Sequence, residues 1–314
     1  MAALPYLTTC VGRLSSLPHD QPRGGFGTEM YEPDEAASSE ILVAVANPAD
    51  VENLIALAAA LAWSPRVANA RILALHVRQT WGAVPRLLGR TDPTSGRAPA
   101  VQRAVSAAND LGVAIQPVEC TAHSAAAGIL AIADSLPDLQ LILLGWRAPT
   151  ALHWMRSGTD QKVIRSAARN VAVLYGRQLN SVKRILVPVS GGQHARLGLR
   201  LARDLATSGI ATKMTALRVL PPGTNEQRAE REEMSVRQLI RSELGRAARR
   251  FRIRAVCAQS VVAGVLNAAG EGYDLIIIGA SERGFLRNRL LGNVPELVAE
   301  RSPCSVLMVR REQH

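Results

Sequence analysis

The feature that most constrains the fold is a strand-then-helix unit that occurs twice in the 314-residue chain. The runs ILVAVANP, from Ile41, and ILVPVSGG, from Ile185, are each followed by a segment with helical apolar spacing, at about residues 50–63 and 193–208. A short, continuous apolar run is typical of a parallel strand buried on both faces. A repeat this long indicates a duplicated domain and not a solenoid.

The rest of each copy follows the same order of strands and helices. The other expected strands are Ala70 to Val77, Val113 to Cys120, Leu139 to Gly145 and Asn170 to Gly176 in the first copy, then Ala211 to Val219, Ile253 to Ser260, Tyr273 to Gly279 and Cys304 to Arg310 in the second. Helices are expected near residues 99–111, 124–135, 226–251 and 263–270, and before each last strand.

This alternation predicts an α/β protein with two tandem, open, five-stranded and mostly parallel sheets flanked by helices, which is a Rossmann-like arrangement. We place the first domain at residues 40–178 and the second at 182–312. Residues 1–39 hold several prolines and an acidic stretch, and their apolar residues follow neither the strand period of 2 nor the helix period of 3.6. This indicates a flexible N-terminal tail.

Charge is unevenly distributed along the chain. Residues 1–180 hold 15 Lys and Arg against 14 Asp and Glu, whereas residues 181–314 hold 22 against 12, so the second half carries most of the net charge of +11. The exposed face of the predicted helix at residues 226–251 is basic, with Arg237, Arg241, Arg249 and Arg250. Either this field attracts an anionic partner or the helix is simply well solvated.

Several classes of protein are disfavoured by what the sequence lacks. The longest uncharged apolar run, Leu54 to Trp63, is about half of the roughly 20 residues that cross a bilayer, and no basic-then-apolar leader opens the chain, so we expect a cytoplasmic protein without a membrane span. The four cysteines lie far apart and are expected to be buried thiols, neither a zinc site nor a disulfide framework. No common catalytic motif is present, and we expect no enzyme.

Glycine ends the fourth strand of both copies, where a doubly wound sheet opens its ligand crevice. In the first copy this residue begins the stretch GWRAPTALHWMRSGT, and in the second GASERGFLRNRLLGN. The order of elements and these stretches resemble the universal stress protein family, over about residues 40–311. The resemblance implies an open five-stranded fold, a role in stress response, and in some members an adenine nucleotide bound at this motif.

The resemblance also implies site residues. In the first copy, Gly145, Ala148, Gly158 and Thr159 fall on the motif positions, where glycines let backbone approach phosphate and a helix begins with a hydroxyl. Ala148 replaces the family's second glycine. Arg147, inside this stretch, is the preferred phosphate contact of the first copy.

The second copy departs further from the motif. Gly279 and Gly292 match, but Glu282 takes the second glycine position and Asn293 the hydroxyl position. The family's Asp after the first strand, which contacts adenine and ribose, is Ala46 in the first copy and Ser190 in the second. ATP or AMP is therefore expected in the first domain more than in the second.

Three histidines near strand ends give one further alternative. His76, His123 and His153 could converge at one crevice and bind a metal, but none has a neighbour at ligand spacing. We therefore expect independent histidines and no metal site.

Three functions remain open. The first is a nucleotide-binding or anion-binding signalling or scaffold protein, and the second is a cytoplasmic regulatory module of an amino-acid or cation transporter. The third is an interaction protein with degenerate pockets that docks an acidic protein through its basic helix. We expect an internal pseudo-dimer through residues 170–175 and 305–309, or a homodimer, and no specific nucleic acid partner.

Overall fold

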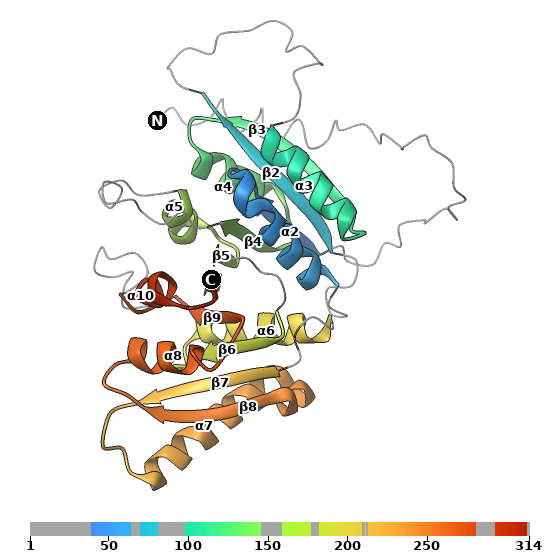
Figure 1. Ribbon diagram of the computed structural model, residues 1–314. Helices are drawn as coiled ribbons and strands as arrows, with labels where there is room; N and C mark the ends of the chain where they lie inside the picture. Colours follow the sequence, from blue (N-terminus) through green and yellow to red (C-terminus); the bar gives the residue numbers. More distant parts are fainter. Residues whose placement is uncertain are drawn as a thin grey trace, which may run out of the picture.

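A ten-stranded sheet with helices on both faces organises the molecule (Figure 1). The computed structural model describes residues 39–63, 70–80, 98–145, 159–176, 182–208, 211, 213–280 and 293–312. The strand order is β3-β2-β1-β4-β5-β10-β9-β6-β7-β8, so each half of the chain supplies five neighbouring strands. The predicted α/β class, with five mostly parallel strands in each half, is confirmed.

The elements of the two halves follow one another in the same order. The first half contains β1 (Glu40–Ala44), α2 (Pro48–Ala62), β2 (Arg71–Gln79), α3 (Pro99–Asp110), β3 (Ile115–Ala122), α4 (Ala125–Ser135), β4 (Leu139–Gly145), α5 (Thr159–Ser166) and β5 (Val171–Tyr175). The second contains β6 (Arg184–Pro188), α6 (Gln193–Thr207), β7 (Lys213–Leu220), α7 (Glu226–Leu244), the 3-10 helix η1 (Gly245–Arg250), β8 (Phe251–Cys257), α8 (Val261–Ala269), β9 (Leu275–Gly279), α10 (Asn293–Arg301) and β10 (Ser305–Arg310).

The two halves join through one antiparallel strand pair. β5 and β10 pair from Val171 with Arg310 to Tyr175 with Val306, which confirms the expected contact between the last strands. All other strand pairs in the described sheet are parallel. Pairing the two last strands removes two exposed sheet edges, each of which would otherwise present unpaired backbone groups.

The hydrophobic core also crosses this junction. One buried cluster combines α2 and α3 with α6 and α7 on one face of the sheet. The other combines α4 and α5 with α8 and α10 on the opposite face. Because each cluster contains side chains from both halves, the halves share their hydrophobic core and are not independently packed domains joined by a linker.

The helix of residues 226–251 is shorter than the sequence predicted. α7 ends at Leu244, where Gly245 has a φ of +57° and stops the helix. Residues 245–250 form η1, and β8 begins at Phe251, two residues before the expected start of that strand.

One prediction about the cysteines is wrong. Cys257, on β8, is exposed, whereas Cys120 and Cys304 are buried as expected. Cys120 lies on β3, the outer strand at the opposite side of the sheet, but α4 covers it: a Cβ on Gly128 of α4 would lie 3.0 Å from Cys120 Sγ. Cys257 is the last residue of β8, where the strand ends.

Candidate functional site

The candidate site of the first half lies where β1 and β4 run side by side. Val43 pairs with Leu143 and Ala44 with Leu144, so both strands end at the same edge of the sheet. From here the chain passes through α2 to β2 on one side and through α5 to β5 on the other. Ligands of doubly wound sheets bind at such a point, where successive connections diverge.

Gly145, at the end of β4, lies beside the first turn of α2. A Cβ built on Gly145 would lie 3.5 Å from Asp50 Cβ and Leu54 Cδ1, and 3.7 Å from Asp50 Oδ2. These are ordinary van der Waals distances, so packing alone does not require glycine here. The packing of α2 on the sheet thus places the Asp50 carboxylate next to the end of β4.

Asp50 is held in place by the cap of α2. Asn47 is the N-cap residue of α2, and its Oδ1 accepts a hydrogen bond from the backbone N–H of Ala49. Its Nδ2 donates to Asp50 Oδ2 at 2.8 Å. The signal Asn-Pro-Ala-Asp, a capping residue with an acidic residue three positions later, could have identified this pair from the sequence.

Gly279, the counterpart of Gly145 in the second half, has a different environment. A Cβ at Gly279 would lie 2.8 Å from Ala195 N and 2.9 Å from His194 C, both backbone atoms at the start of α6. Backbone cannot move aside as a flexible side chain can, so close packing of α6 on β9 requires glycine at this position.

Thr159 is the first residue of α5, and its side chain is exposed. α5 leads into the amino end of β5, so its own N-terminus points back toward the edge of the sheet at which β4 ends. A helix N-terminus offers unpaired N–H groups and a partial positive charge to an anion.

The end of α5 is fastened by the second half. Arg310 is 2% exposed, and its Nη2 donates to the backbone oxygens of Ala167 and, at 3.0 Å, Arg169. Burial lowers the pKa of the Arg310 guanidinium below its ordinary value, while the charge of Glu312 acts in the opposite direction. The backbone N–H of Glu312 also donates to Asn170 Oδ1 at 3.0 Å. This contact could not be predicted from the sequence, since a single Arg at a strand end carries no distinctive signal.

The other predicted site residues are placed only in part. Ala46 and Ser190 are exposed just after β1 and β6, and Asn293 begins α10. Four predicted residues lie outside the described part of the chain: Arg147, Ala148, Gly158 and Gly292.

Of the three histidines considered as metal ligands, His76 and His123 are described, and they have separate surroundings. His76 Nδ1 lies 3.0 Å from the Val45 carbonyl oxygen, and His123 is exposed. At the position equivalent to His76 in the second half, Arg218 Nη1 donates to the Val189 oxygen at 3.2 Å. His153 lies outside the described residues, and among those described no group of three potential metal ligands occurs.

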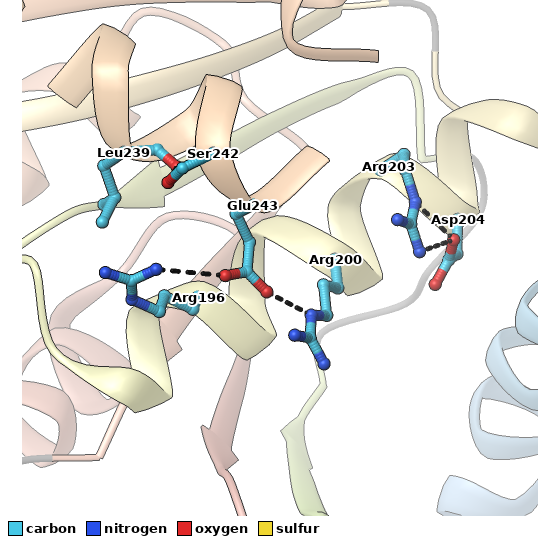
Figure 2. A network of polar contacts seen from close by, with 7 residues as sticks. All are labelled: Arg196, Arg200, Arg203, Asp204, Leu239, Ser242 and Glu243. Atoms are coloured by element: carbon cyan, nitrogen blue, oxygen red, sulfur yellow. Dashed lines mark hydrogen bonds and ion pairs between the residues drawn. The ribbon is translucent and has the colours of Figure 1, made fainter. Parts of the chain in front are cut away.

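A charged cluster joins α6 to α7 in the second half (Figure 2). Glu243 accepts hydrogen bonds from Arg196 Nη1, at 3.2 Å, and from Arg200 Nε. Burial raises the pKa of Glu243, but the hydrogen bonds and charges of Arg196 and Arg200 outweigh this and hold the pKa below its ordinary value. The carboxylate therefore stays ionised, and the three groups together carry a net positive charge.

Comparison with known proteins agrees with this architecture. Residues 181–310 match the universal stress protein family model. A functionally unknown protein from Pseudomonas aeruginosa PAO1 has the same fold, with a TM-score of 0.56 and 18% identity over 88% of this chain and 94% of its own. A universal stress protein from Archaeoglobus fulgidus DSM 4304 gives 0.56 and 14%, over 87% and 97%.

The cytoplasmic domain of a prokaryotic cation chloride cotransporter is also similar in fold. Its TM-score is 0.55 at 11% identity, and the match covers 88% of this chain and 96% of that domain. No curated protein matches the sequence significantly. Among the described helices, none is both long and apolar enough to cross a bilayer.

Proposed function

We propose that this chain, in which a universal stress protein domain at residues 181–310 follows a first half of the same fold, binds an adenine nucleotide or a related small anion in its first half. The bound ligand is not converted, and partner proteins respond to the ligand-bound state of the chain. The observation that carries the proposal is the environment of Gly145: it ends β4 at the divergence point, and packing alone does not explain it.

Polar groups at this edge suggest how such a ligand is oriented. Asp50 and Asn47 offer oxygen acceptors to ribose hydroxyls or to an exocyclic amine. The Asp50 carboxylate repels phosphate, so the phosphates lie toward the N-terminus of α5 and Thr159. Asp50 thus takes the part that the resemblance assigns to an Asp at the position of Ala46.

The second half is not proposed to bind nucleotide. Its glycine at the end of β9 is already required by contact with the backbone of α6. Its counterpart of Asn47 is Gly191, which brings no polar side chain to the edge. We assign the second half to the shared core and to contact with partners.

The first experiment is calorimetric titration of the full chain with ATP, AMP and a cyclic dinucleotide. We expect binding of at least one of them, abolished in Gly145→Val, whose branched side chain fills the space beside Asp50. Asp50→Asn keeps the shape and weakens binding by roughly tenfold, because a charged acceptor is replaced by a neutral one.

Ser190→Ala provides the matched control in the second half, at the position equivalent to Ala46. Its affinity is expected to equal that of the unchanged chain. If none of the three ligands gives a binding signal in calorimetry, the nucleotide proposal is wrong. It is also wrong if Gly145→Val binds a ligand with the same affinity as the unchanged chain.

A second candidate is a regulatory module that works beside a transporter. It is favoured by the similarity in fold to the cotransporter domain over 88% of this chain. Affinity purification of the tagged chain from its native membranes tests it, with a permease or cotransporter as the expected partner. Absence of any transporter from the purified material argues against this candidate.

A further inference from the structure

The end of α7 and the whole of η1 carry a dense group of arginines. Between residues 237 and 250 five arginines are exposed, and Glu243 is the sole carboxylate in that stretch. We call this group the arginine surface, and it consists of Arg237, Arg241, Arg246, Arg249 and Arg250. None of the five belongs to an ion pair with another described residue.

Glu243 does not neutralise the arginine surface. Its side chain is 7% exposed and points toward α6, where Arg196 and Arg200 bind it (Figure 2). Those two arginines exceed the charge of the carboxylate, so the cluster beneath adds to the positive field. The arginine surface therefore faces solvent with its charge uncompensated.

Among the described residues of the first half, the corresponding helix and the segment after it carry no equivalent surface. α3, the counterpart of α7, contains Arg103, which pairs with Glu52 at 3.0 Å, and it ends with Asp110. The segment between Asp110 and β3 contains no charged residue. The charge at this position is thus a property of the second half and not of the shared fold.

The apolar side chains near the arginine surface are already used by the fold. Val236, Ile240 and Leu244 on α7 are buried against the sheet, so α7 cannot place an apolar face in a bilayer. Residues 237–250 contain no aromatic side chain on which unpaired bases could stack. Of the large apolar residues that are exposed in the described part of the chain, Met234 is the one on α7, and a single such residue is less than the apolar centre of a protein interface.

A partner of this surface must therefore bind through charge. Duplex nucleic acid carries about one negative charge per 1.7 Å of its axis, and guanidinium groups match phosphate oxygens in two-point contacts. We propose that the arginine surface binds the phosphodiester backbone of duplex nucleic acid without reading its sequence. Lack of sequence preference agrees with the expectation of no specific nucleic acid partner, since backbone contacts carry no base information.

This surface is separate from the proposed nucleotide site. It adjoins the amino end of β8 in the second half, whereas Gly145 and Asp50 lie at the carboxyl end of β4 in the first. Failure of either proposal therefore leaves the other intact.

Fluorescence anisotropy with a labelled duplex of about two helical turns, roughly 20 base pairs, tests the proposal on the full chain. We expect a dissociation constant on the order of 10⁻⁶ to 10⁻⁴ M at physiological salt. Five phosphate contacts predict a slope of about −4.5 for log affinity against log salt. Arg249→Gln with Arg250→Gln is expected to reduce the magnitude of that slope by about 2 and to weaken binding by roughly tenfold or more.

The matched control is Arg228→Gln with Arg231→Gln, which removes two exposed charges from the opposite end of α7. Its affinity is expected to stay within about twofold of the unchanged chain. Circular dichroism confirms that both variants are folded. Equal losses in the two variants would show attraction by net charge alone and overturn the proposal.

Vesicles containing phosphatidylserine provide the competing partner. Binding to vesicles at a salt concentration that abolishes duplex binding would identify a membrane surface and overturn the proposal. No duplex binding at low salt has the same consequence.

Discussion

Gly145 and Gly279 end equivalent strands, yet the two halves surround them differently. The start of α6 lies so close to Gly279 that a Cβ would meet backbone at 2.8 Å, whereas the start of α2 leaves ordinary distances of 3.5 Å around Gly145. The same letter at the same motif position thus has two physical explanations. A motif glycine indicates a ligand site only after contact with the neighbouring helix has been excluded as its cause.

Replacing each of these two glycines by alanine is expected to give the largest difference in stability between the two halves. Gly279→Ala forces β9 and α6 apart and is expected to destabilise the protein by about 3 kcal/mol. Gly145→Ala fits the available space and is expected to cost under about 1 kcal/mol. Chemical denaturation of the two variants measures the difference, and equal costs would contradict the two explanations.

Arg310 gives the next largest expected effect, because the halves differ here as well. Its counterpart at the end of the first half is Gly176, so the buried guanidinium fastens the junction from one side only. Arg310→Ala leaves the oxygens of Ala167 and Arg169 without this donor and is expected to cost about 2 kcal/mol.

Hydrogen exchange locates the effect of Arg310→Ala. Faster exchange is expected in α5 and β5, while amides of β7 and β8 stay protected. Uniform acceleration across both halves would indicate that Arg310 supports the core in general and not the junction.

The helix pairs α6–α7 and α2–α3 provide a smaller contrast. Glu243→Gln breaks a largely buried contact with two arginines and is expected to cost about 1–2 kcal/mol. Glu52→Gln breaks an exposed ion pair with Arg103, in which the Arg103 side chain is 53% exposed and the Glu52 side chain 61%. This change is expected to cost under about 0.5 kcal/mol of stability. Thermal unfolding of both variants at neutral pH tests the order, which equal losses would refute.

The contribution of Glu243 to stability is also expected to depend on pH. Since the pKa of Glu243 is lower in the folded protein than in the unfolded chain, its contribution to stability is present above its ordinary pKa of about 4.5. The contribution disappears as the pH falls below that value. The difference in unfolding free energy between the unchanged chain and Glu243→Gln should therefore narrow as the pH falls below about 4.5 and through the lowered pKa of Glu243.

Most of the fold was predictable because its signals are local and occur twice. The runs at Ile41 and Ile185 could be recognised as buried parallel strands from composition alone, and they occupy β1 and β6. The boundary at Phe251 was predicted wrongly because Phe251 continued the apolar spacing of α7, while Gly245 had already ended the helix. A positive φ at one glycine overrides a periodic pattern.

The candidate site was less predictable. The sequence indicated Gly145 and Thr159 through a motif, but Asp50 reaches the end of β4 only through the packing of α2 on the sheet. Contacts such as Arg310 with Ala167 join residues far apart in the chain, and no local pattern encodes them.

The antiparallel pairing of β5 with β10 has a consequence for how this molecule can diverge. When two identical subunits meet across such a pair, every substitution appears on both sides of the twofold axis. Here both sides belong to one polypeptide, so an arginine can be introduced at one side of the junction while its mirror position remains glycine. Gene fusion thereby releases the two halves from symmetry, and each is free to specialise for a different task.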